Sequence, residues 1–437
     1  MNDVHQKDYY WPKYQLILFR FFTIYFILST AIWSWLSTIP WFDFLGTYST
    51  ALTEAYTGFF NSYIFEIKEE LVPTRGSGDT SMGWATLYAQ LFMALIGSII
   101  WSILDRKRRH YKWGSLVIRN VVRYYIVLFA FLYGIIKIFG LQMPPPSNSY
   151  YATDLGHFSA MRFSWNFIGY SKGYEFFSGL MEALVGVFLL YRRTILLGAL
   201  LGIGVFTNVF LLNMSYDIPV KIFSFQLLLA CMFISVSNWH RVLNFLVLNK
   251  SATSDSSWNI PYAKPWLRPV RLVLKSLFVA GFVVYPFYNY YDTYTSRRDD
   301  MASPPFKRGF YNIENFVLNG DTIPPEINSN AHWKDLVIDG GRRGSIGLVD
   351  STFRVRYGRS YFFHFSLDSL GELLTIKRFS GDTVPIFKGT YESLPNYGLR
   401  LNGVYKEQDS LQVELIWDNR DYQLARKEFN WMLESVP

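Results

Sequence analysis

One glutamate, Glu182, lies inside the apolar run GLMEALVGVFLLYRRT of residues 179–194, which ends in two arginines. Placing an ionised carboxylate at the centre of a bilayer costs about 2.5–3.5 kcal/mol on insertion scales, so such a residue needs a partner or a function. Gly179 and Gly186 lie within about 60° of Glu182 on a helix, and small residues let a second helix approach closely. Glu182 is therefore predicted to face protein rather than lipid.

The preceding apolar segment carries a polar stripe that contains the best partner for Glu182. Arg119 and Lys137 are five helical turns apart and share a face, with Arg123 and Tyr133 within about 40° of it. Lys137 is the predicted partner. The pair either handles protons and holds a ligand, or only locks the packing of two helices. The cationic ends of the stripe can also snorkel to the headgroups.

Three segments expected on the outer side add further polar groups: TRGSGDTSMGW (74–84), YATDLGHFSAMRFSW (151–165) and NMSYDIPVK (213–221). A polar pocket that opens outward and is covered by the C-terminal domain would explain them together. Separate explanations also exist, because Asp79 or Thr80 can simply cap a helix and YDIP can simply form a turn. The predicted pocket residues are Asp79, Tyr133, Lys137, His157, Arg162, Glu182, Asn208, Asn213, Asp217 and Lys221.

The composition narrows the chemistry of the chain. A single cysteine, Cys231, can form neither an internal disulfide nor a cysteine-based zinc or iron–sulfur site. The six histidines do not pair at matching depths on apolar segments, so bis-histidine haem ligation is not expected. Zincin, Walker A, nucleophile-elbow and dinucleotide-binding motifs do not occur. We expect no metal site, and no nucleic-acid partner despite the net charge of +8, because the cations cluster in short loops between apolar segments.

Apolar segments long enough to cross a bilayer indicate a polytopic helical domain over residues 1–298. The loops assigned to the inside hold fourteen Lys and Arg residues, and those assigned to the outside hold five. This asymmetry predicts that the N-terminus is cytoplasmic and the C-terminus is extracytoplasmic. A shorter segment, RVLNFLVLNK (241–250), is predicted to lie along the inner surface. The seven predicted spans are 15–37, 82–104, 116–139, 173–191, 194–213, 219–237 and 272–291.

From about residue 299 the hydrophobic pattern changes to a period of two. LQVELIW (411–417) and TFRVRYG (352–358) each place their apolar residues on one face. Turn sequences such as Asn319-Gly320 separate six to nine short strands. Residues 299–437 are therefore predicted to form an all-β sandwich or a small lipocalin-like barrel outside the membrane.

The segments FLYGIIKIFGLQMP (131–144), GYEFFSGLMEALVGVFLLYRRTILLGALLGIGVFTNVFLLN (173–213) and YDIPVK (216–221) resemble the DoxX-like family of membrane proteins. The likeness covers roughly residues 80–240 and is closest to the larger forms of Gram-negative bacteria of the Bacteroidetes type. It implies a four-helix core in the inner membrane and a link to quinone or thiol redox chemistry. Thiol redox chemistry would need a pair of cysteines, and this chain has only Cys231. The matching positions are Tyr133, Gly134, Lys137, Glu182, Gly186, Arg192 and Arg193.

A transporter or lipid-modifying enzyme that uses the outward pocket is one hypothesis, and seven spans without an evident inverted repeat argue against transport. Two further functions are open from the sequence. The first is an inner-membrane protein with an outward polar pocket that serves a redox, quinone-linked or lipid-linked function. The second is a membrane-anchored scaffold whose periplasmic β domain binds a partner protein or an envelope component. The bilayer is a partner in both, and a quinone is the cofactor that the resemblance implies. No catalytic motif is recognisable.

Overall fold

A computed structural model describes residues 10–74, 78–251, 258, 264–299, 305–324, 332–349, 358–368, 370–379 and 381–426. The chain forms two compact units. The helical unit consists of Met1–Phe139 and Phe176–Asn289, and the barrel unit of Gly140–Glu175 and Tyr290–Pro437. The sequence prediction had placed residues 140–175 with the helices.

Within the described residues, six helices are long and apolar enough to cross a membrane, and a bent pair would make a seventh. The prediction of about seven spans agrees with this count. In lipid a helix satisfies its own backbone hydrogen bonds, so long apolar runs adopt this form. The spanning segments contain α1 (Lys13–Thr30), α3 (Ser81–Leu104), α4 (Lys112–Ile138), α7 (Lys172–Leu190), α8 (Ile195–Ser215) and α11 (Leu267–Val279).

The bent pair corresponds to the predicted span at 219–237 and the predicted interfacial segment at 241–250. α9 (Lys221–Val236) is followed by α10 (Trp239–Val242) and η6 (Leu243–Val247), with a bend of 79° between the two parts. α11 continues through η7 (Ala280–Val284) into α12 (Tyr285–Asp299), as predicted for the last span.

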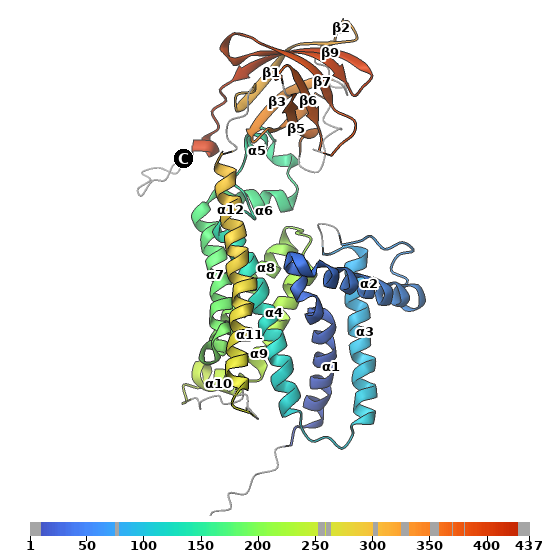
Figure 1. The fold of residues 1–437 in the computed structure, drawn as a ribbon, viewed down its shortest axis with the longest axis vertical. Helices are drawn as coiled ribbons and strands as arrows, with labels where there is room; N and C mark the ends of the chain where they lie inside the picture. The colour runs from blue at the N-terminus through green and yellow to red at the C-terminus, as the bar shows by residue number, and fades with distance from the viewer. Residues whose placement is uncertain are drawn as a thin grey trace, which may run out of the picture. The chain divides into compact units, whose positions relative to one another are not determined.

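Sequence analysis missed the long helix α2 (Asp43–Phe60). It runs across α1 and α3 instead of alongside them (Figure 1). Its polar side faces α3, since the hydroxyls of Thr57 and Thr86 lie 3.0 Å apart. Large apolar side chains of α2, such as Phe44 and Tyr48, are exposed. This arrangement is typical of a helix that lies in the membrane interface.

The C-terminal residues form antiparallel β-sheet, as the period-two pattern predicted. The short β2 extends only β1, while β1 pairs with both β3 and β9. The predicted strand at 352–358 lies almost entirely outside the described residues. The strands are β1 (Gly309–Leu318), β2 (Asp321–Thr322), β3 (Trp333–Gly340), β4 (Arg343–Leu348), β5 (Tyr361–Leu367), β6 (Leu373–Lys377), β7 (Phe387–Ser393), β8 (Leu399–Tyr405) and β9 (Asp409–Asp418).

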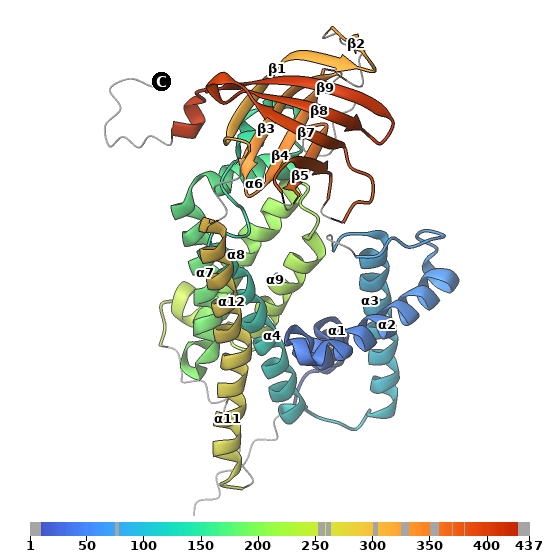
Figure 2. The ribbon, with the colours of Figure 1, turned by 45° about the horizontal axis from the view of Figure 1, so that its top comes forward.

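Pairing of β1 with β9 closes eight of these strands into a barrel, and Figure 2 shows β9 between β1 and β8. The structure thus resolves the predicted choice between sandwich and barrel. Large side chains fill its centre, among them Trp333, Phe363 and Phe387. An eight-stranded barrel is just wide enough for such a filling. Leu411, Val413 and Leu415 of β9 point inward, as their alternation predicted.

Residues 140–175 dock onto the barrel through α5 (Asn148–Tyr151) and are followed by α6 (Ala160–Tyr170). The amide and hydroxyl of Ser149 donate hydrogen bonds of 2.8 and 2.7 Å to the two carboxylate oxygens of Asp339. The side-chain amide of Asn148 donates to the carbonyl of Ile338 at 2.9 Å. These bonds cover the end of β3 and explain why the segment belongs to the barrel unit.

Candidate functional site

The closest helix contact around Glu182 is the one between α4 and α7. A Cβ atom on Gly179 would lie 2.6 Å from the carbonyl oxygen of Gly134 and 2.8 Å from the amide of Ile138. A Cβ on Gly134 would lie 2.8 Å from the amide of Ala183. Only glycine permits this approach, because real Cβ atoms do not come so near to backbone. The predicted small-residue contact is present.

This contact brings Lys137 and Glu182 together. Lys137 Nζ donates a short hydrogen bond to Glu182 Oε1, and both side chains are buried in the protein. Glu182 is only 2% exposed, and within the described chain its Oε2 has no hydrogen-bond partner. The predicted pair therefore forms. Because desolvating two charges offsets much of their attraction, the pair specifies packing more than it adds stability.

The glycine contact predicts that the same substitution, glycine to alanine, has different effects on stability at Gly179 and at Gly204. We expect Gly179→Ala to lower the unfolding free energy by about 1–3 kcal/mol, since α7 must move away from α4. The control is Gly204→Ala on α8, where a Cβ meets nothing within 4 Å. Alanine favours a helix more than glycine does, so the control should be unchanged or more stable. Thermal unfolding in detergent measures both, and equal behaviour would contradict the contact.

Four other predicted residues form a second cluster that links α3, α8 and α9. Asp79 accepts hydrogen bonds from the amides of Lys221 (2.7 Å) and Ile222 (3.1 Å), so it caps the start of α9. Lys221 Nζ lies 2.7 Å from Asp217 and keeps the pKa of that exposed carboxyl below its usual range. Asn213 donates to the hydroxyl of Ser224 at 2.9 Å. The cluster therefore joins helix ends, and Asp79 caps α9 instead of α3, the helix that follows it in the sequence.

Tyr133 and Asn208 take different positions. The half-buried ring of Tyr133 packs 5.8 Å from the ring of Phe223 on α9. Asn208 is exposed on α8. Arg119, Arg123 and Lys137 of the predicted α4 stripe are all buried, as expected for a face that points into the bundle.

His157 and Arg162 belong to the barrel unit. His157 Nδ1 lies 3.4 Å from the exposed carboxylate of Asp154. Arg162 Nη1 donates to the hydroxyl of Tyr150 at 2.6 Å. Eight of the ten predicted residues thus fall into three groups: the Lys137–Glu182 pair, the cap around Asp79, and these two residues of the docked segment. Tyr133 and Asn208 belong to none of them.

The docked segment also lines a cavity of about 760 Å³, which sequence analysis did not identify. Thr153, Asn166, Ser171 and Gln423 add polar groups to a mainly aromatic wall. Burial, together with the neighbouring Tyr170, raises the pKa of the Tyr151 phenol. The aromatic lining residues are Tyr150, Tyr151, Phe158, Phe163, Phe167, Tyr170, Tyr174 and Tyr422.

A cavity of this size and lining suits a small amphiphilic ligand, since ligand sites are typically 300–1,000 Å³ and mainly apolar. The sequence held a signal for it, the density of tyrosine and phenylalanine between residues 150 and 174. The contribution of Tyr422, more than 250 residues further on, could not be seen from spacing.

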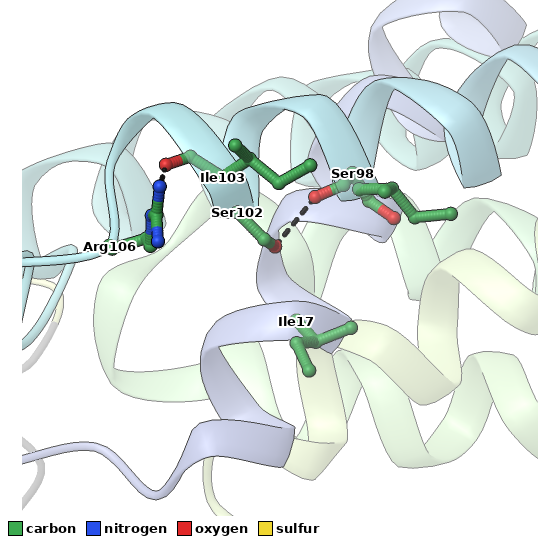
Figure 3. Close-up of a pocket in the computed structure, with 6 residues that line it drawn as sticks. Ile17, Ser98, Ser102, Ile103 and Arg106 are labelled. Atoms are coloured by element: carbon green, nitrogen blue, oxygen red, sulfur yellow. Dashed lines mark hydrogen bonds between the residues drawn. The ribbon is translucent and has the colours of Figure 1, made fainter.

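A shallower groove of about 460 Å³ lies between α1 and α3, and Figure 3 shows Ile17, Ser98, Ser102, Ile103 and Arg106 along it. Its polar groups already bond within the chain. Ser102 donates to the carbonyl of Ser98 at 2.6 Å, and Arg106 Nε to that of Ile103 at 3.0 Å. The groove is thus mainly an apolar seam between two helices.

The long apolar helices indicate a membrane protein that carries a C-terminal β-barrel unit. No family model matches the chain, and no solved structure matches it. The uncharacterized protein YwoB of Bacillus subtilis (strain 168) is 41% identical over 69 residues, which are 16% of this chain. The match spans 45% of the length of that relative.

Proposed function

We propose that this is a multi-pass protein of the cytoplasmic membrane whose barrel unit binds a lipid-like amphiphile. The aromatic cavity lined by residues 146–174 and 422–424 carries this proposal. Flat aromatic rings bind alkyl chains and planar head groups without requiring charge, and Asn166 and Ser171 can orient a polar head. The excess of cations in the loops assigned to the inside supports an extracytoplasmic barrel.

A quinone is one amphiphile of this class, and a second candidate site for it lies at Glu182. The buried Oε2 of Glu182 can accept a hydrogen bond from a quinol hydroxyl. This second candidate includes the proposal that the chain is related to the DoxX-like family. The contact of α4 with α7 supports it, because three of the motif positions, Gly134, Lys137 and Glu182, meet there.

Photolabelling of the full-length protein in nanodiscs tests both sites. The probes are a diazirine-bearing fatty acid and a photoreactive quinone analogue, and labelled peptides are mapped by mass spectrometry. We expect enriched label on residues 146–174 and 422–424, and a loss of it in the F163A/F167A variant. Both side chains are more than 40% exposed, so their truncation should not unfold the unit.

The matched control is Phe379→Ala, which removes an exposed phenylalanine of the same unit that does not line the cavity. Label that is spread over the spanning helices, and equal in wild type and both variants, would overturn the cavity proposal. Quinone label confined to residues 131–138 and 179–186 would instead favour the site at Glu182.

A further inference from the structure

Three cations from different elements of the helical unit converge on the C-terminal turn of α7. Arg123 of α4 donates a hydrogen bond from Nε to the carbonyl of Leu189. Lys275 of α11 donates to the carbonyl of Leu190 at 2.7 Å. Arg192 follows directly in η5 (Arg192–Thr194). The bonds to neighbouring carbonyls, together with the position of Arg192 two residues after Leu190, gather the three charges at one end of α7.

Aromatic side chains enclose this group of cations. Trp258, which is 4% exposed, lies with its ring centroid 5.8 Å from the guanidinium carbon of Arg123. The ring of Tyr191 lies 4.8 Å from Lys275 Nζ. Arg123 itself is only 2% exposed. The charges are therefore partly withdrawn from solvent. Inside the protein the repulsion between them is stronger than in water.

The positive charge is not balanced by the part of the chain that the structure describes. No carboxylate there pairs with Arg123, Arg192 or Lys275, and the buried Nη2 of Arg192 has no hydrogen-bond partner. A helix C-terminus offers roughly half a negative charge against these three positive ones. Capping α7 therefore explains the positions of Arg123 and Lys275, but not the presence of Arg192.

We propose that Arg123, Arg192 and Lys275 form a binding site for a phosphate group, such as that of an anionic lipid headgroup. Guanidinium groups bind phosphate oxygens in pairs, and a lysine adds a point charge. The site lies at the bundle end that the loop charges assign to the cytoplasm, where anionic lipid is available. It is in the helical unit and does not depend on the aromatic cavity.

Native mass spectrometry of the full-length protein in detergent tests the site by titration with phosphatidylglycerol and with phosphatidylcholine. We expect wild type to prefer phosphatidylglycerol. The R192Q/K275Q variant should bind it roughly thirtyfold less tightly, because each cation near such a headgroup contributes about one kcal/mol. R192Q alone should lose about fivefold. Since Arg192 Nη2 bonds to nothing described, that single variant should fold normally.

The matched control, R106Q/R193Q, removes two exposed cations from the same end of the bundle and gives the same net charge. An equal loss in this control would overturn the site, and so would a wild type that shows neither a preference for phosphatidylglycerol nor stabilisation by inorganic phosphate. A parallel arm adds inorganic phosphate without lipid and follows thermal unfolding. Stabilisation of wild type but not of R192Q, without a lipid preference, would support the phosphate site with a soluble ligand as its source.

Discussion

Replacing Lys137 by methionine is expected to lower the unfolding free energy of the helical unit by about 3–5 kcal/mol. The substitution leaves the carboxylate of Glu182 buried at 2% exposure without its cation. Glu182→Leu should cost a similar amount, since it strands Lys137 in the same way. Thermal unfolding in detergent, followed by circular dichroism, measures each variant.

The double variant K137M/E182L is the control that separates packing from the cost of an unpaired charge. Apolar side chains of similar volume can replace a buried pair with little loss, so the double variant should recover most of the stability. If it is as unstable as the single variants, the pair contributes more than charge balance. If it is stable but loses quinone label on residues 131–138, Glu182 belongs to a ligand site.

Replacing Asp335 of the barrel by alanine (D335A) is expected to lower the free energy needed to open β3 and β4 by about 3–5 kcal/mol. Asp335 pairs with Arg359 through a short hydrogen bond, and both side chains are buried. Arg359 Nε also donates to the hydroxyl of Ser345 at 3.0 Å. Without Asp335, the guanidinium stays buried with only neutral partners. Hydrogen exchange of peptides from 333–348 should speed up by roughly two to four orders of magnitude.

Asp421→Ala provides the matched comparison in the same unit. Asp421 pairs with Arg426, but both side chains are exposed. Exposed pairs contribute little to stability, so exchange of the barrel peptides should not change. If D335A and D421A behave alike, the buried pair has no special role in the barrel.

The spanning helices could be predicted because each depends on a local property, a long apolar run. Lys137 and Glu182 could be paired in advance because helical spacing fixes their faces and few charges exist inside the bundle. α2 was missed for the opposite reason: large apolar residues point outward while Ser49 and Thr57 are buried, so it lacks the pattern of a span or of a soluble helix.

Two features of the site depend on contacts that no local pattern encodes. Asp79 caps α9, although Thr80 caps its own helix α3 by accepting a hydrogen bond from the amide of Gly83 at 3.3 Å. Asp79 caps α9 and not its own helix because the first residues of α9, at Lys221, lie beside it in the fold although they are distant in the sequence. In the same way, the aromatic cavity needs Tyr422 beside Tyr151, with ring centroids 5.9 Å apart.

Closure of the barrel by β1 and β9 has a kinetic consequence. Phe310 pairs with Asp418, and Leu318 with Leu411, so the closing contacts join residues about a hundred positions apart. Such contacts must overcome a large loss of chain entropy before they form, and proteins rich in them fold slowly. During synthesis β9 emerges last, while Ser149 must wait for Asp339, 190 residues later. The barrel unit is therefore expected to close only once β9 has been synthesised, with unpaired strand edges exposed until then.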